Sequence, residues 1–125
     1  MTTWTPEELD SLGNAEELHI ASRRPDDTLR PFVTIWVVRV DDDIYVRSAH
    51  GATNPWYRRA MAVGRGRIRA SGVEHDVEFT TPPAEVTGDM VDDAYHAKYD
   101  RYGQAIVGRV TGADAHGQTI RLLRS

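Results

Sequence analysis

Cysteine is absent from the 125-residue sequence, and lysine occurs only once, at Lys98. The first absence excludes disulfide bonds, thiol nucleophiles and cysteine-ligated metal sites. Long apolar runs are also missing, because no stretch approaches the roughly 20 residues that a membrane-spanning helix needs. The N-terminal residues lack the basic and apolar regions of a signal peptide. A soluble, cytoplasmic protein without a membrane contact is the expectation.

Catalytic motifs are missing as well. The sequence contains no Gly-x-Ser-x-Gly, phosphate-binding loop, dinucleotide fingerprint or His-Glu-x-x-His. Histidines are scattered without the spacing of metal ligands, which predicts no metal site. They are His19, His50, His75, His96 and His116. Binding chemistry is therefore favoured over metal-dependent or hydrolytic chemistry.

Charge is modest overall and unevenly distributed. The net charge of −4 argues against general nucleic-acid binding. Ten arginines stand against five aspartates between His19 and Arg69, whereas eight acids and one lysine follow between Ala70 and Asp100. A GC-rich genome would also give many arginines. Their clustering fits a local anion site, because guanidinium groups match phosphate and carboxylate.

One apolar stretch dominates the pattern and organises the rest of the chain. Residues 32–40 are mostly β-branched or aromatic and apolar on both faces, which predicts one central strand. A turn at 41–43 and a strand at 44–48 follow. After a glycine-containing loop at 49–53, Asn54-Pro55 predicts a helix start, with the helix ending near Gly64.

A second hairpin is predicted over residues 66–79, with its turn at Ser71-Gly72. This turn places Arg69 opposite Glu74 and Arg67 opposite Asp76, while the apolar residues share the other face. Arg67 and Arg69 are therefore assigned to ion pairs and not to a ligand site.

The remaining elements complete the predicted fold. A capping box at Thr5 to Glu8 starts a short helix, and further elements are expected at the positions that follow. They are a strand at 18–21, a helix from about 89 to 102, a turn at 114–117 and a strand at 118–123. The total is one mainly β (α+β) domain over residues 1–125, with six antiparallel strands in a small barrel and two main helices.

The polar loop 22–30 has two interpretations. It is either a solvated hairpin loop or an anion clamp with Arg24, Thr28 and Arg30 as donors. A phosphate would also meet free N–H groups at the Pro55 helix start. Nearby aromatic side chains could cover a ring system or belong to the core. These are Trp36, Tyr45, Trp56 and Tyr57.

Residues 22–79 resemble the split-barrel flavin- and deazaflavin-binding proteins, which include nitroreductases of mycobacterial type. The resemblance rests on Ser22-Arg23-Arg24 with Thr28 and Arg30, and on Thr53-Asn54-Pro55-Trp56-Tyr57. It implies a six-stranded split β-barrel, a homodimer and a phosphorylated cofactor such as FMN or a deazaflavin. The loop lacks the two glycines and the lysine of that group.

A closer resemblance, over nearly the whole chain, is to the bacterial domain-of-unknown-function 2255 family. The matching motifs are Ile35–Val38, Tyr45–Ser48, Gly51 with Trp56-Tyr57, and Ala94–Tyr99. The residues that this resemblance adds to the candidate cofactor site are Arg47, Ser48, Trp56, Tyr57, Lys98 and Tyr99. Packing of a helix against the barrel explains Lys98 and Tyr99 equally well.

Two functions remain open at this point. In the first, Arg24, Arg30 and Arg47 with Ser48 hold the cofactor phosphate, Trp56 and Tyr57 flank its ring, and a small molecule is reduced. In the second, the protein is a non-enzymatic dimeric barrel that binds a small anionic ligand. The loop 22–30 lacks the two glycines and the lysine of the cofactor-binding group, which favours the non-enzymatic function.

Overall fold

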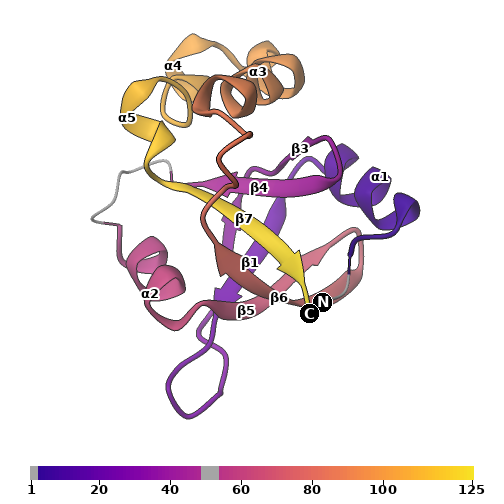
Figure 1. The fold of residues 1–125 in the computed structure, drawn as a ribbon, viewed down its shortest axis with the longest axis vertical. Helices are drawn as coiled ribbons and strands as arrows, with labels where there is room; N and C mark the ends of the chain where they lie inside the picture. Colours follow the sequence, from indigo (N-terminus) through magenta and orange to yellow (C-terminus); the bar gives the residue numbers. More distant parts are fainter. Residues whose placement is uncertain (1–2, 49–53) are drawn as a thin grey trace.

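The computed structural model describes residues 3–48 and 54–125 and is built on one antiparallel sheet. Across these residues the sheet has seven strands in the order β2-β1-β5-β6-β7-β4-β3 (Figure 1). The strands are β1 (Leu18–Ser22), β2 (Val33–Ile35), β3 (Val38–Val40), β4 (Asp43–Arg47), β5 (Arg65–Ala70), β6 (Val73–Thr80) and β7 (Thr119–Arg124). The helices are α1 (Pro6–Asn14), α2 (Pro55–Val63), α3 (Gly88–Tyr99), α4 (Gln104–Val107) and α5 (Ala113–His116), with a 3-10 turn η1 (Asp100–Tyr102).

The predicted mainly β, antiparallel architecture is confirmed, but the prediction of six strands is wrong. The single central strand expected at 32–40 is two short strands, β2 and β3, at opposite edges of the sheet. The chain leaves the sheet between them because the backbone N–H of Val37 donates to the Tyr99 hydroxyl and its carbonyl accepts from Lys98. The run 32–40 is apolar on both faces because alternate residues pack in two different clusters, and not because it is a central strand. Val33, Ile35 and Val37 pack in the main core, whereas Trp36, Val38 and Val40 pack in the cluster that contains the buried residues of α3.

The link between β2 and β3 also determines the shape of the sheet. The edges of a flat seven-stranded sheet would lie roughly 29 Å apart, given the spacing of neighbouring strands. Only Trp36 and Val37 join β2 to β3, and a link of this length spans about 10 Å. The sheet must therefore curl until its two edges approach each other, which gives a half-barrel (Figure 1).

The hairpin of β5 and β6 confirms the predicted register. Arg67 pairs with Asp76 and Arg69 with Glu74, and the turn residues Ser71 and Gly72 both have positive φ. The Arg67 Nε lies 2.9 Å from Asp76 Oδ1. The ion pair expected for Arg69 is not found among the described contacts, because its guanidinium lies 4.4 Å over the Phe32 ring instead.

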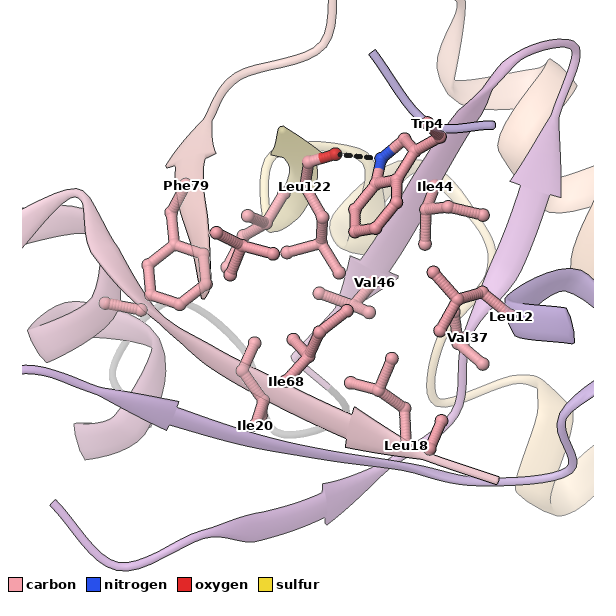
Figure 2. Packing of buried hydrophobic residues seen from close by; sticks show 14 of the residues in the cluster. Trp4, Leu12, Leu18, Ile20, Val37, Ile44, Val46, Ile68, Phe79 and Leu122 are labelled. Atoms are coloured by element: carbon pink, nitrogen blue, oxygen red, sulfur yellow. Dashed lines mark hydrogen bonds between the residues drawn. The ribbon is translucent and has the colours of Figure 1, made fainter. Parts of the chain in front are cut away.

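The core fills the inside of the curled sheet and is closed by the N-terminal segment (Figure 2). The Thr5–Glu8 capping box is present, and α1 buries Leu9 and Leu12. Just before the helix, Trp4 Nε1 donates to the Leu122 carbonyl at 3.0 Å, which ties the start of the chain to β7.

Helices α3, α4 and α5 lie together at one end of the sheet, and α2 lies apart from them (Figure 1). As expected, α2 is capped by Asn54 and stops at Gly64, whose φ is +74°. Thr87 caps α3, which ends at Tyr99, and η1 continues to Tyr102. The turn expected at 114–117 is instead part of helix α5. None of the helices described is long and apolar enough to cross a membrane. The glycine-containing loop and the Gly51 motif residue lie outside the described residues.

Candidate functional site

An apolar cleft of about 530 Å³ lies between β2, the start of α2 and the segment after α4. Here it is called the aromatic cleft, because Trp36 and Trp56 form part of its wall. Trp36 is held flat by Tyr99, with ring centroids 4.1 Å apart and planes 3° from parallel. The full lining is Val33, Thr34, Ile35, Trp36, Arg47, Asn54, Pro55, Trp56, Arg59, Ile106, Arg109 and Val110.

Arg59 and Arg109 give the aromatic cleft its charge. Both are exposed, and neither forms an ion pair or side-chain hydrogen bond with any described residue. No carboxylate occurs among the described lining residues. The start of α2 adds the favourable end of a helix dipole at Asn54 and Pro55. An apolar cleft with unpaired arginines suits a flat ligand that carries negative charge.

A smaller cavity of about 170 Å³ shares part of its lining with the aromatic cleft. The two share Val33, Trp56 and Arg59, and the smaller cavity adds Ser22 and Arg30. The Arg30 Nε is shielded from solvent and has no hydrogen-bond partner among residues 3–48 and 54–125. Arg30 and Arg59 thus both line the smaller cavity, whereas Arg109 lines the larger cleft.

The rest of the predicted anion clamp is engaged within its own loop. Arg24 Nη1 donates to the Thr28 hydroxyl at 3.3 Å and to the Leu29 carbonyl at 2.9 Å. Asp26 accepts from the Thr28 hydroxyl and backbone N–H. Among the described contacts, Arg30 differs from the other two predicted donors, because it lines the smaller cavity and its Nε has no partner there.

Arg47 lies in a buried network behind the aromatic cleft. Its guanidinium donates to Thr119 Oγ1 at 2.7 Å, to the Val110 carbonyl at 2.7 Å and to the Gly88 carbonyl at 3.0 Å, and it pairs closely with Asp92. Four protein acceptors therefore surround a side chain with no exposed surface. The network joins β4 and β7 to the first turns of α3 and to the segment after α4.

Asp92 is the negative centre of this network. Its second carboxylate oxygen accepts from the Gly112 N–H at 3.1 Å and lies 2.9 Å from His116 Nε2. Burial alone would raise the pKa of Asp92, but the hydrogen bonds from His116, Arg47 and Gly112 hold it below its usual value. A Cβ at Gly88 would lie 2.2 Å from the His116 ring, so a larger residue there would displace His116 from Asp92.

Asp89 brings a third ligand-type group close to Asp92 and His116. Asp89 is 91% exposed, and the Arg47 guanidinium already neutralises Asp92. The contacts of Asp92 and His116 are thus explained as an internal ion-pair network.

Ser48 and Tyr57 occupy supporting positions. Ser48 is 1% exposed, next to the Arg47 network. Tyr57 packs its ring edge against Trp56 and donates its hydroxyl to the Gly117 carbonyl at 3.0 Å. Burial raises the pKa of the Tyr57 phenol. Tyr57 therefore connects α2 to the end of α5 and supports the Trp56 wall from behind.

Lys98 and Tyr99 do not line the aromatic cleft. Tyr99 is buried, donates to the Glu16 carbonyl at 2.8 Å and contacts both backbone groups of Val37. Lys98 lines a separate cleft of about 400 Å³ between α1, β3 and α3, called here the amine cleft. The packing alternative for these two residues is thus observed, and Tyr99 reaches the aromatic cleft only through Trp36.

Two cleft arginines were missed in the sequence. Arg59 follows Pro55 by four residues, and residues with this spacing share one face of a helix. The sequence therefore indicated that Arg59 lies on the same face as the predicted helix start. Arg109 belongs to the segment 104–110, which had no assignable pattern. His116 and Asp92 are 24 residues apart, and nothing in their spacing indicated a contact.

The chain belongs to the family of uncharacterised proteins conserved in bacteria (DUF2255), whose model matches residues 8–122. A search of curated proteins finds no match.

Among solved structures, HutZ, the heme storage protein from Vibrio cholerae, is similar with a TM-score of 0.61 and 13% identity, over 99% of this chain and 92% of that one. A FAD-binding protein from Mesorhizobium loti has a TM-score of 0.55 and 17% identity, over 99% and 92%. An F420 reductase has a TM-score of 0.51 and 16% identity, over 92% and 89%. At these identities the likeness concerns the fold.

Proposed function

We propose that this member of the DUF2255 family is a split-barrel protein that binds a phosphorylated flavin or deazaflavin in the aromatic cleft and reduces a small molecule. The observation that supports the proposal most directly is that Arg59 and Arg109, which have no ion-pair partner among the described residues, line the same cleft as Trp36 and Trp56. The fold is shared with proteins described as FAD-binding and as an F420 reductase, which supports the same ligand class.

The dimensions and chemistry of the cleft fit such a ligand. Small-molecule sites commonly enclose 300–1,000 Å³ and combine apolar walls with a few polar groups, and the aromatic cleft holds about 530 Å³. Trp36 and Trp56 would contact the ring system. Arg30 and Arg59 would hold the phosphate, and Arg109 would neutralise charge elsewhere on the ligand. When bound, the cofactor would supply the two-electron chemistry, while the protein orients it.

The proposed assembly is a homodimer. The edge strand β2 pairs only with β1 among the described strands, and it also lines the aromatic cleft. A second copy placed along this edge would cover the cleft. Light scattering of the purified protein at several concentrations measures the mass directly, and a monomer throughout would contradict this part.

Titration of the purified protein with FMN and with a deazaflavin tests the function. Quenching of tryptophan fluorescence is the readout, because Trp36 and Trp56 line the cleft whereas Trp4 is in the core. Arg59→Ala is expected to weaken binding about tenfold, the usual loss for one charged hydrogen bond. Arg58→Ala is the matched control, since Arg58 is the exposed neighbour outside the cleft lining.

Saturable quenching that Arg59→Ala weakens and Arg58→Ala leaves unchanged would support the proposal, and a bound ligand that is reduced and then reoxidised by a small molecule would support the enzymatic part. No quenching by either compound would contradict cofactor binding in this cleft.

A second candidate function is binding of a small anion without redox chemistry. The self-contained bonds of Arg24 and Thr28 favour it, because they leave Arg30 as the one free donor of the predicted clamp. Quenching by a non-flavin aromatic anion, with none by FMN, would support this candidate.

A further inference from the structure

The Lys98 amine is half-buried and has one short polar contact. Its Nζ donates to the Val37 carbonyl at 2.6 Å and lies 5.1 Å over the Tyr99 ring, contacts that the charged form can also make. Lys98 forms no ion pair within residues 3–48 and 54–125. An ammonium carries three donors, and the described residues offer it one hydrogen-bond acceptor. A neutral amine would donate the same bond and leave its lone pair free.

The charged groups around Lys98 do not restore the missing counter-ion. On α1, Asp10 is paired with Arg39 of β3 at 3.0 Å, and both line the amine cleft. Beyond α1, Glu16 is paired with Arg101 at 2.8 Å. Burial lowers the pKa of Lys98 to about 8; Glu16 opposes this change and Arg101 adds to it. Tyr99 stays neutral, since burial raises its pKa to about 12.

Lys98 is one of the residues that line the amine cleft. The cleft has a volume of about 400 Å³, and its lining combines small or apolar side chains with the polar side chains of Asp10, Asn14 and Arg39. Its lining is Leu9, Asp10, Gly13, Asn14, Val38, Arg39, Ala94, Ala97 and Lys98. The small side chains of Ala94 and Ala97 leave room on the α3 side for a molecule of a few carbon atoms.

We propose that Lys98 is a carbonyl-reactive amine that forms an imine with small aldehydes in the amine cleft. The neutral nitrogen attacks the carbonyl carbon, and a carbinolamine forms. Loss of water then gives the carbon–nitrogen double bond, so the carbonyl oxygen leaves with the two protons of the amine. The step needs no oxidant or reductant, and it is independent of the function proposed for the aromatic cleft.

Reductive alkylation of the native protein tests the proposal cleanly, because Lys98 is the only lysine. Acetaldehyde and cyanoborohydride convert each imine to a stable ethylamine, which peptide mass spectrometry locates. At pH 8 an amine with a pKa of about 8 is neutral on the order of a hundred times more often than an ordinary lysine. We expect Lys98 to react at least about tenfold faster than N-acetyl-lysine amide, because a less basic amine is also a weaker nucleophile.

The pH profile and two controls identify the cause. The rate at Lys98 is expected to rise with a midpoint near pH 8 in the native protein. In guanidinium chloride the midpoint moves to that of the model amine, because unfolding returns Lys98 to water. Ala97→Phe narrows the amine cleft and slows the reaction, whereas Ala62→Phe, at an exposed site on α2 outside this cleft, does not.

Two outcomes would overturn the proposal. The first is a native Lys98 that reacts no faster than the model amine at pH 8. The second is fast labelling that survives both unfolding and Ala97→Phe, because the cleft would then have no role.

Discussion

Arg47 and Arg109 line the same cleft but have opposite surroundings. Arg47 is inaccessible to solvent and donates to four protein acceptors, including the Asp92 carboxylate. Arg109 is exposed and bonds to none of the residues described. The guanidinium of Arg47 has nearly all its donors committed before any ligand arrives, whereas that of Arg109 has all of them available.

This difference separates a stabilising arginine from a binding arginine. A buried guanidinium must be fully hydrogen-bonded to offset its lost hydration, so it holds its partners in one arrangement. An exposed guanidinium bears no such cost and keeps its affinity for an external anion. For Arg47, the predicted role as a phosphate ligand is therefore less favoured than a role in stabilising the fold. Arg59 and Arg109 are better placed to bind a phosphate.

The largest expected effect is that of Arg47→Ala on stability. The substitution leaves the Asp92 carboxylate, 14% exposed, without its buried counter-charge. Breaking a buried pair in this way typically costs about 3–5 kcal/mol. Guanidinium denaturation followed by circular dichroism measures the loss, with Arg58→Ala as the neutral control. A stable Arg47→Ala protein that fails to bind FMN would instead support the predicted phosphate role.

A smaller effect on the same network should appear on acidification. The pKa of Asp92 is lower in the folded protein than its ordinary value of 3.8, so the folded state favours the charged form. That stabilisation is fully present above pH 3.8 and is lost as pH falls through the lower folded pKa. Asp92→Asn should remove this contribution and flatten the dependence of the unfolding free energy on pH below about 3.8. An unchanged acid limb in the variant would contradict the assignment.

The local elements were predictable because their determinants are close in sequence. The hairpin register followed from Ser71-Gly72 and the facing charges, and two helix starts followed from Thr5 and Asn54. The break at Val37 was not predictable in this way. Its cause is a pair of hydrogen bonds from Lys98 and Tyr99, about 60 residues further along the chain. A run of β-branched residues gives no sign that one peptide group is bound elsewhere.

The candidate site follows the same division. Trp56 and Arg30 were identified from local motifs, and both line the connected cavities. The sequence could not tell which arginines are paired and which are unpaired. Pairing depends on acceptors such as Val110 and Asp92, which long-range packing brings to Arg47. The density of arginines between His19 and Arg69 indicated an anion site, but it did not indicate which arginines would bind the anion.

Arg109→Ala is expected to have the smallest effect on stability. It also gives the most direct test of the contrast between Arg47 and Arg109. An exposed side chain without a described partner should change the unfolding free energy by no more than about 0.5 kcal/mol. The same substitution should weaken binding of FMN about tenfold if Arg109 contacts the ligand, as a charged hydrogen bond does. Fluorescence titration and denaturation of one protein sample measure both quantities, with Arg101→Ala as a control, since Arg101 is exposed and its ion pair with Glu16 lies outside the aromatic cleft. A loss of stability comparable to that of Arg47→Ala would mean that Arg109 has a structural partner, and the contrast between the two arginines would no longer hold.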